Sequence, residues 1–301
     1  MCNYFKESGV TMILGTERKM YKDSRWSKEI ISLQSKDGMW GYFHTLSEPN
    51  KHPITTEQAL RRLQILGYTI EDNCIQKAVQ YMHDCLVGKK ETPDRREKTH
   101  DWDIFTQLML STWIRRFTKD DDSANAVAQI WADIISFAFK SGIYSHEDYL
   151  SAYKETFSKK AQGGRLVDFV SFYQVSLVSD CLNKEIECAV FDYIINHEVG
   201  IYYIYSDPIC YLPELFESKK CSRYIRAIEL LSDYKNNLDK LTFVTDWLNE
   251  HKNADNKWDL GSSVKDFISF PLSNSWDKKS RIDDCTFRIK QLINRINPRG
   301  I

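Results

Sequence analysis

The sequence predicts an all-α protein of roughly eleven helices, and two observations carry that prediction. A hydroxyl residue followed three positions later by an acid or amide is a helix-start signature, and it recurs at Thr55, Thr69, Ser145 and Ser280. Apolar residues then recur at helical spacing, which indicates helices that bury one face. No proline interrupts the block between Pro93 and Pro208.

The order of the elements follows from the breaks between them. Residues 1 to about 20 are expected to form a loose leader, and residues 21–301 one domain, because no Ser/Gly-rich linker divides them. Turn residues mark breaks near Gly38, Gly67, Gly88–Pro93, Gly142, Gly163-Gly164, Gly200, Pro208–Pro213 and Gly261.

Three segments have distinctive patterns. Helical periodicity runs from Ile104 to Phe117 and from Val127 to Ala138. Residues Val167 to Leu182 are apolar nearly all round, which predicts a helix enclosed by other helices. The segment Gly200–Tyr205 has strand-like composition, and an extended aromatic connector is the alternative.

Composition excludes several classes of protein. The 41 basic and 42 acidic residues nearly cancel, so nucleic-acid binding is not expected. No stretch approaches the ~18 apolar residues of a membrane span, and no secretion signal is visible at the start. None of the eight cysteines forms a CxxC pair, so we expect free thiols in the reducing cytoplasm.

A turn and the helix pair after it carry a resemblance to a known family. The turn has Gln34, Gly38 and Trp40 in a QxxxGxW pattern, and helical segments follow at Thr55–Gly67 and Thr69–Met82. This unit resembles the repeat of the terpenoid cyclase and protein prenyltransferase (squalene-cyclase-like) superfamily. The resemblance implies an α/α toroid around a central cavity, with the turn tryptophan packed against the glutamine.

A second, degraded copy of the turn lies near the end of the chain. It spans Asp255–Gly261 around Trp258, with Lys252 and Asn256 where the family has glutamine and glycine. Its presence implies that both ends of the chain belong to the repeat architecture.

The family's catalytic motifs are missing. Class II terpene cyclases have an Asp-x-Asp-Asp motif, which neither Asp101-Trp-Asp103 nor Asp120–Asp122 matches. The zinc site of the prenyltransferases combines Asp, Cys and His, and no comparable cluster can be read from this sequence. We therefore predict no metal site, and the cofactor and the question of catalysis stay open.

The candidate catalytic residues are His100, Asp101, Asp103 and Asp284. The first three open a helix, where they could act as general acid and base or simply cap it. Asp284 could belong to a second acid-bearing rim together with Trp276 and Arg281.

The candidate ligand-binding residues are Trp102, Arg165, Tyr202, Tyr203, Tyr205, Trp258, Trp276 and Arg281. Arg165 follows two glycines and could hold a phosphate at a helix start, whereas a plain turn with an Arg165–Asp168 pair is the alternative. The tyrosines and Trp258 could line a cavity or belong to the core.

Three functional hypotheses remain. The first is binding, and perhaps processing, of an apolar, isoprenoid-like small molecule in a toroid cavity, by analogy of fold. The second is a carbohydrate-active α/α barrel with paired carboxylates. The third is a non-catalytic scaffold for another protein, recognised by an exposed apolar patch.

Overall fold

The protein is described by a computed structural model that covers residues 21–44, 52–96, 98, 101–164 and 166–298. The expected leader, residues 1–20, lies outside this part of the chain. The all-α prediction is confirmed: the described residues contain eleven α-helices and two 3₁₀ helices, and no β-strand. The α-helices are α2 (Arg25–Ser32), α3 (Thr56–Ile65), α4 (Asn73–Leu86), α5 (Trp102–Phe117), α6 (Asp122–Ala138), α7 (His146–Phe157), α8 (Phe172–Leu177), α9 (Lys184–Asn196), α10 (Lys219–Leu231), α11 (Thr242–Glu250) and α12 (Lys278–Ile296), and the 3₁₀ helices are η1 (Lys235–Leu241) and η2 (Ser262–Val264).

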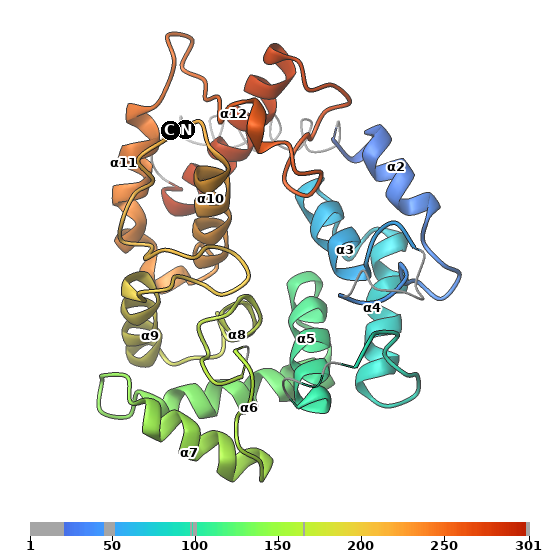
Figure 1. Cartoon of the computed structure of the whole chain (residues 1–301), viewed down its shortest axis with the longest axis vertical. Coiled ribbons are helices and arrows are strands. Elements are labelled where there is room, and N and C mark those ends of the chain that lie inside the picture. The colour runs from blue at the N-terminus through green and yellow to red at the C-terminus, as the bar shows by residue number, and fades with distance from the viewer. Residues whose placement is uncertain (1–20, 45–51, 97, 99–100, 165, 299–301) are drawn as a thin grey trace, which may run out of the picture.

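Helices α4 to α7 each pack against the next, α5 also packs against α8, and the last part of the chain returns to the first (Figure 1). The contact between the two ends is polar as well as apolar. Trp26 Nε1 donates to the Ser273 carbonyl at 2.9 Å, and the rings of Tyr21 and Phe287 lie 4.9 Å apart. The first and last helices therefore belong to one folded unit.

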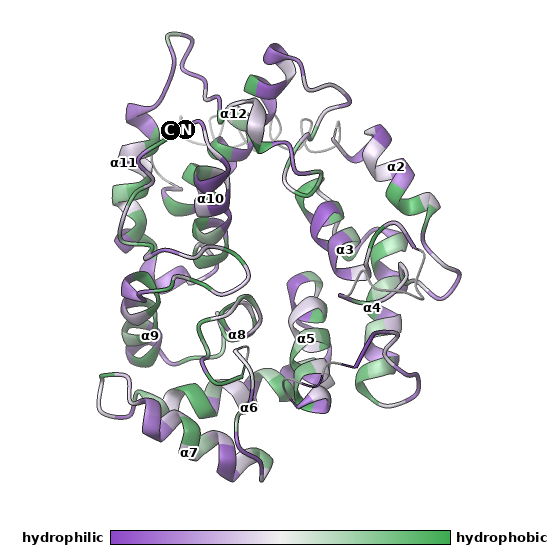
Figure 2. Cartoon of the chain, in the orientation of Figure 1, coloured by the Kyte–Doolittle hydropathy of each residue, from purple (hydrophilic) through white to green (hydrophobic). Residues whose placement is uncertain are grey.

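The helices are amphipathic, as the periodicity predicts. Hydrophilic and hydrophobic residues alternate along α6 and α7 at helical spacing (Figure 2), and α6 buries its apolar residues, including Trp131, Ile134 and Ile135. In the described part of the chain, no helix has both the length and the apolar character that crossing a membrane requires.

Two of the four predicted helix starts are confirmed. Thr55 and Gln58 form a reciprocal capping box before α3, and Ser145 accepts the Asp148 N–H before α7. The other two are wrong by three residues.

In each of those two cases an aspartate is the N-cap instead of the hydroxyl residue. Helix α4 starts after Asp72, which accepts the Thr69 N–H at 2.7 Å. Helix α12 starts after Asp277, which accepts the Ser280 N–H at 3.0 Å. The Asp277 side chain caps α12, whereas the Asp72 side chain makes no cap hydrogen bond to α4 and instead closes the turn that precedes this helix.

The long buried helix predicted over Val167–Leu182 is also wrong in length. Helix α8 has only six residues, although all six are buried as predicted. Backbone groups before it pair across the chain instead: Phe172 N–H donates to Tyr202 O at 3.1 Å, and Tyr202 N–H donates to Val170 O at 3.0 Å. Segment Gly200–Tyr205 is thus a tight connector that contributes isolated bridges.

The two tryptophan turns have the same hydrogen bonds. Trp40 Nε1 donates to the carbonyl ten residues earlier, Ile30, at 2.7 Å, and Trp258 Nε1 donates to Leu248, also ten residues earlier, at 2.6 Å. The backbone N–H of each tryptophan also donates to a threonine hydroxyl of the following α-helix: Trp40 to Thr56 of α3 at 2.9 Å, and Trp258 to Thr286 of α12 at 3.0 Å. Both indoles are buried, so each turn fastens three chain segments together.

Candidate functional site

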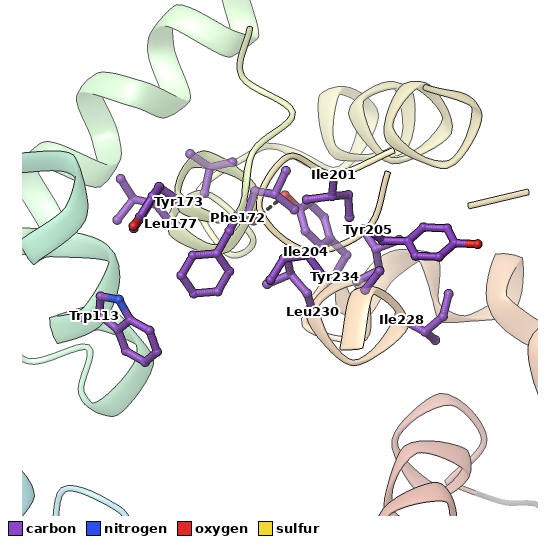
Figure 3. Close-up of a cluster of buried hydrophobic side chains, with 14 of the residues drawn as sticks. Trp113, Phe172, Tyr173, Leu177, Ile201, Ile204, Tyr205, Ile228, Leu230 and Tyr234 are labelled. Carbon is purple, nitrogen blue, oxygen red and sulfur yellow. Dashed lines mark hydrogen bonds between the residues drawn. The ribbon is translucent and has the colours of Figure 1, made fainter. Parts of the chain in front are cut away.

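A cavity of about 660 Å³ lies between helices α3, α5, α8, α10 and α12, and we call it the central cavity. Figure 3 shows part of its apolar wall, where Trp113 comes from α5, Phe172 from α8 and Leu230 from α10. Eight cationic side chains but only three carboxylates line it. The cations are Arg61, Arg115, Arg116, Lys119, Arg226, Lys235, Arg288 and Arg295, and the acids are Asp180, Glu229 and Asp233.

Arg61 of α3 is held rigidly at the wall of this cavity. Its Nη2 lies 2.9 Å from Glu57 Oε1, one helical turn earlier, and its guanidinium lies 4.5 Å from the ring centroid of Phe172. Glu57 also accepts the Tyr173 hydroxyl at 3.1 Å and Trp113 Nε1 at 3.4 Å. All acceptor capacity of this buried carboxylate is therefore directed at fixed donors.

Arg116 of α5 has only neutral partners. It donates to Gln64 Oε1 at 2.6 and 3.0 Å and to Ser176 Oγ at 3.0 Å, and it pairs with no carboxylate among the described residues. Burial lowers the pKa of Arg116 to about 10; Asp233 opposes this shift, and Arg61 adds to it. It stays cationic at neutral pH without a counter-ion beside it.

Arg226 of α10 also lacks a hydrogen bond to a carboxylate. Its nearest carboxylate oxygen, on Asp266, lies 3.9 Å away, too far for a hydrogen bond. Burial and the neighbouring Arg61 and Arg288 lower the pKa of Arg226 to about 10. Cations outnumber acids among the residues that line the central cavity, and Arg116 has no carboxylate partner among the described residues, so the wall carries an excess of positive charge.

Arg288 differs because it has a strong partner. It forms a two-bond pair with Glu229, at 2.6 Å for each bond. Burial alone would raise the pKa of Glu229, but Arg288 outweighs it and the pKa is lowered. This pair joins α10 to α12 at the cavity wall.

A second cavity of about 580 Å³ adjoins the central cavity, and we call it the tyrosine cavity. The two share Arg61, Ile204 and Arg226 in their walls. The structure brings three predicted ligand-binding residues together here: Tyr202, Tyr203 and Tyr205.

The acids predicted at the start of α5 lie elsewhere. Asp101 is the N-cap of α5 and pairs with Lys159 at 2.5 Å, while Asp103 is exposed and lies 3.8 Å from Arg96. Burial would raise the pKa of Asp101, but the ion pair with Lys159 and the backbone N–H groups of α5 together outweigh burial and lower the pKa. Asp101 and Trp102 line a separate cavity of about 560 Å³, which Asp103 does not border; His100 lies outside the described residues.

Asp284 lies in α12, fully buried. It accepts the Leu272 N–H at 2.8 Å and both the N–H and the hydroxyl of Ser273 at 3.1 Å. Burial nevertheless raises its pKa. Leu272 lines the central cavity, so this acid stands directly behind the wall.

Three other predicted residues, Trp258, Trp276 and Arg281, make structural contacts in the C-terminal segment. Arg281 makes a two-bond pair with Asp259, at 2.7 Å for each bond, and Trp276 Nε1 donates to the Ser262 carbonyl at 3.2 Å. Trp258 is the buried turn tryptophan described above. Arg165 lies outside the described residues, so its phosphate-binding prediction stays a prediction.

Sequence reasoning missed the arginines of the central cavity. A signal was present, because Arg61 and Arg116 interrupt apolar faces at Leu60–Leu63 and Trp113–Phe117. An arginine on the buried face of a helix needs a partner or a ligand. Among the described residues, no group of three or more His, Cys, Asp or Glu side chains is arranged to hold a metal ion.

Comparisons with protein-family models, with curated proteins and with solved structures find no match to this chain.

Proposed function

We propose that the protein binds an isoprenoid-like small molecule with an anionic end in the central cavity. The observation that carries this proposal is the wall of the cavity, where unpaired arginines stand beside aromatic rings. An anionic group would pair with Arg116 and Arg226, and Trp113 and Phe172 would pack against an apolar body. The volume of about 660 Å³ suits a ligand of that size.

The arrangement of the helices that we propose is the α/α toroid of the terpenoid cyclase and prenyltransferase superfamily. Two observations support it. The central cavity is lined mainly from α3, α5, α8, α10 and α12, while their neighbours α2, α4, α9 and α11 contribute no residue to it. The turns at Trp40 and Trp258 repeat the same hydrogen bonds, as expected of one structural unit used twice.

Processing of the ligand would need an acid in the cavity wall. Glu57 and Glu229 are committed to arginines, so neither is a good proton donor. Asp284, whose pKa is raised, lies behind the wall and accepts the backbone N–H groups of residues 272–273, so we propose binding without processing.

The carbohydrate alternative has weaker support. It requires paired carboxylates of which one is protonated, whereas Asp101 and Asp103 are both paired with cations outside the central cavity. The scaffold alternative is supported only by scattered exposed side chains such as Tyr211 and Leu215.

Thermal unfolding with farnesyl diphosphate, farnesol and inorganic diphosphate tests the proposal. Farnesyl diphosphate at ~100 times its Kd should add about 2.7 kcal/mol of stability, and farnesol much less. Arg116→Gln should weaken the effect of farnesyl diphosphate at least tenfold. Lys290→Gln removes an exposed charge of α12 outside both cavities and should leave it unchanged.

Two outcomes would overturn the proposal. One is the absence of any shift with farnesyl diphosphate in the folded protein. The other is equal weakening by Arg116→Gln and Lys290→Gln, which would indicate non-specific attraction to the protein's cations.

A further inference from the structure

The tyrosine cavity is lined by different residues from the central cavity, and these residues favour a different ligand. Its wall combines three tyrosines with Ile201 and Ile268 on one side and two arginines of α10 on the other. An apolar surface facing a small number of charged groups is typical of a site for an amphipathic small molecule.

The two arginines are Arg223 and Arg226, and both lack a hydrogen-bonding acid. They are three residues apart, so they lie on the same face of α10. Arg223 is exposed and forms no ion pair in the described part of the chain, and Arg226 approaches only Asp266, at 3.9 Å. Asp266 Oδ1 already accepts the backbone N–H groups of residues 268–270, at 2.6 to 3.1 Å.

The acids bordering the tyrosine cavity cannot neutralise this pair. Glu57 is committed to Arg61 and Tyr173, and His44 at the rim is hydrogen-bonded to Asp94. Arg223 has no carboxylate partner in the described residues, and Arg226 has only the distant Oδ2 of Asp266, with which it forms no hydrogen bond. The two guanidinium groups therefore keep donors for a ligand oxyanion, which each can bind through two parallel hydrogen bonds.

The opposite wall is held in a fixed shape. Tyr203 has a φ of +76°, rare for a residue with a bulky side chain, and its ring lies 6.3 Å from that of Tyr173. The connector is fastened by His197, whose Nδ1 lies 2.9 Å from the Gly200 carbonyl oxygen. Strain of this kind is often retained at binding sites, and here it presents a half-exposed tyrosine ring to the cavity.

We propose that the tyrosine cavity is a binding site for a monocarboxylate with an aliphatic or aromatic body. The carboxylate pairs with Arg226 and Arg223, and the body lies against Tyr202 and Tyr203. The site is separate from the diphosphate-type ligand proposed for the central cavity, although Arg226 borders both.

Isothermal titration with decanoate, decyl phosphate, decanol and acetate tests this assignment. Decanoate should bind, acetate should bind at least tenfold more weakly for lack of a body, and decanol should bind at least tenfold more weakly for lack of a charge. Arg226→Gln should weaken decanoate at least tenfold, whereas Lys219→Gln, an exposed charge on the same helix outside the cavity, should change it less than twofold.

Tyr203→Gly provides a second variant that does not depend on the arginine. It relieves the positive φ and should fold at least as well as the natural protein, yet it should weaken decanoate several-fold. Arg116→Gln should leave decanoate binding unchanged while weakening farnesyl diphosphate, which distinguishes the two cavities.

Three results would overturn the assignment. These are no binding of decanoate, binding that is insensitive to both Arg226→Gln and Tyr203→Gly, and tighter binding of decyl phosphate than of decanoate.

Discussion

Gly38 and Asn256 occupy equivalent positions, two residues before the turn tryptophan, and both have positive φ, +102° and +56°. The hydrogen bonds that close the two turns also match: Ser35 N–H donates to Met39 O at 2.9 Å, and Asn253 N–H donates to Lys257 O at 2.8 Å. Asparagine is among the few residues other than glycine that enter the left-handed region readily. The second turn thus keeps the backbone of the first with a different sequence.

Gly38→Ala should destabilise the protein by about 2 kcal/mol or more, because the conformation is strained and the new Cβ would collide with the Lys77 carbonyl. Gly88→Ala is a matched control, since Gly88 has a φ of +75° but nothing within 4 Å of the new atom. Its cost should be about 1 kcal/mol. Urea denaturation measures both, and equal costs would contradict the collision.

Asn256→Gly should be tolerated, with a change in the free energy of unfolding of less than about 1 kcal/mol, because glycine adopts the same backbone freely. Asn256→Val should cost more, because a β-branched residue resists positive φ. A valine variant as stable as the glycine variant would refute the equivalence of the turns.

Trp40→Phe and Trp258→Phe should each destabilise by about 0.5–1.5 kcal/mol beyond their lost volume, because each removes one hydrogen bond from a carbonyl that then keeps a single backbone N–H partner. Trp131→Phe removes a buried indole that makes no hydrogen bond in the described structure, so it corrects for the lost volume. The turns lie in different parts of the chain, so the two costs should add within about 0.5 kcal/mol in the double variant. Strong non-additivity would show that the turns are coupled.

His197 and Asp168 form a pair whose stabilising effect depends on pH. The hydrogen bond between Nε2 and Oδ2, 3.0 Å long, raises the pKa of His197 above 6.5. Burial would raise the pKa of Asp168, but the interaction with His197 and the Val170 N–H together outweigh burial and lower the pKa below 3.8. The His197 contribution is full below pH 6.5 and lost as pH rises through the folded pKa, and the Asp168 contribution is full above pH 3.8 and lost as pH falls.

The difference in unfolding midpoint between the natural protein and His197→Gln should therefore be largest near pH 5 and smaller at pH 8. Asp168→Asn should remove the same pH-dependent part. A difference that stays constant from pH 5 to pH 8 would show that the imidazole acts through shape alone.

Asp284→Asn should lower the free energy of unfolding by about 1–3 kcal/mol. The Leu272 and Ser273 N–H groups donate to the carboxylate of Asp284, and the asparagine would replace one of its two acceptor oxygens with an NH₂ donor. Asp283→Asn is the adjacent control; its partner Lys257 forms a half-exposed pair, which contributes little. If both variants were equally stable, Asp284 would not be holding residues 272–273.

Hydrogen bonds between residues close in the sequence could be predicted better than contacts between distant segments. The capping box at Thr55 and the degraded turn at Trp258 depend on nearby residues, and both are found. Helix α8 starts later than predicted because the backbone groups of Val170 and Phe172 pair with Tyr202, thirty residues after Phe172 in the chain. A pairing over that distance cannot be read from the local sequence pattern.

The same limit applies to the candidate site. The tyrosines of Gly200–Tyr205 form one local cluster and were predicted together. Arg61, Arg116 and Arg226 come from three different helices, and only the fold shows that they share a cavity.

Closure of the two chain ends has a consequence for synthesis on the ribosome. Arg62 of α3 donates to the carbonyls of Ile268 and Pro271, the nearer of which lies 206 residues downstream. At ~5–20 residues per second, roughly 10–40 seconds pass between the emergence of these partners. A nascent chain therefore holds α3 with its buried cation unsatisfied until residues 268–271 have been synthesised, and chaperones would meet that incomplete surface first.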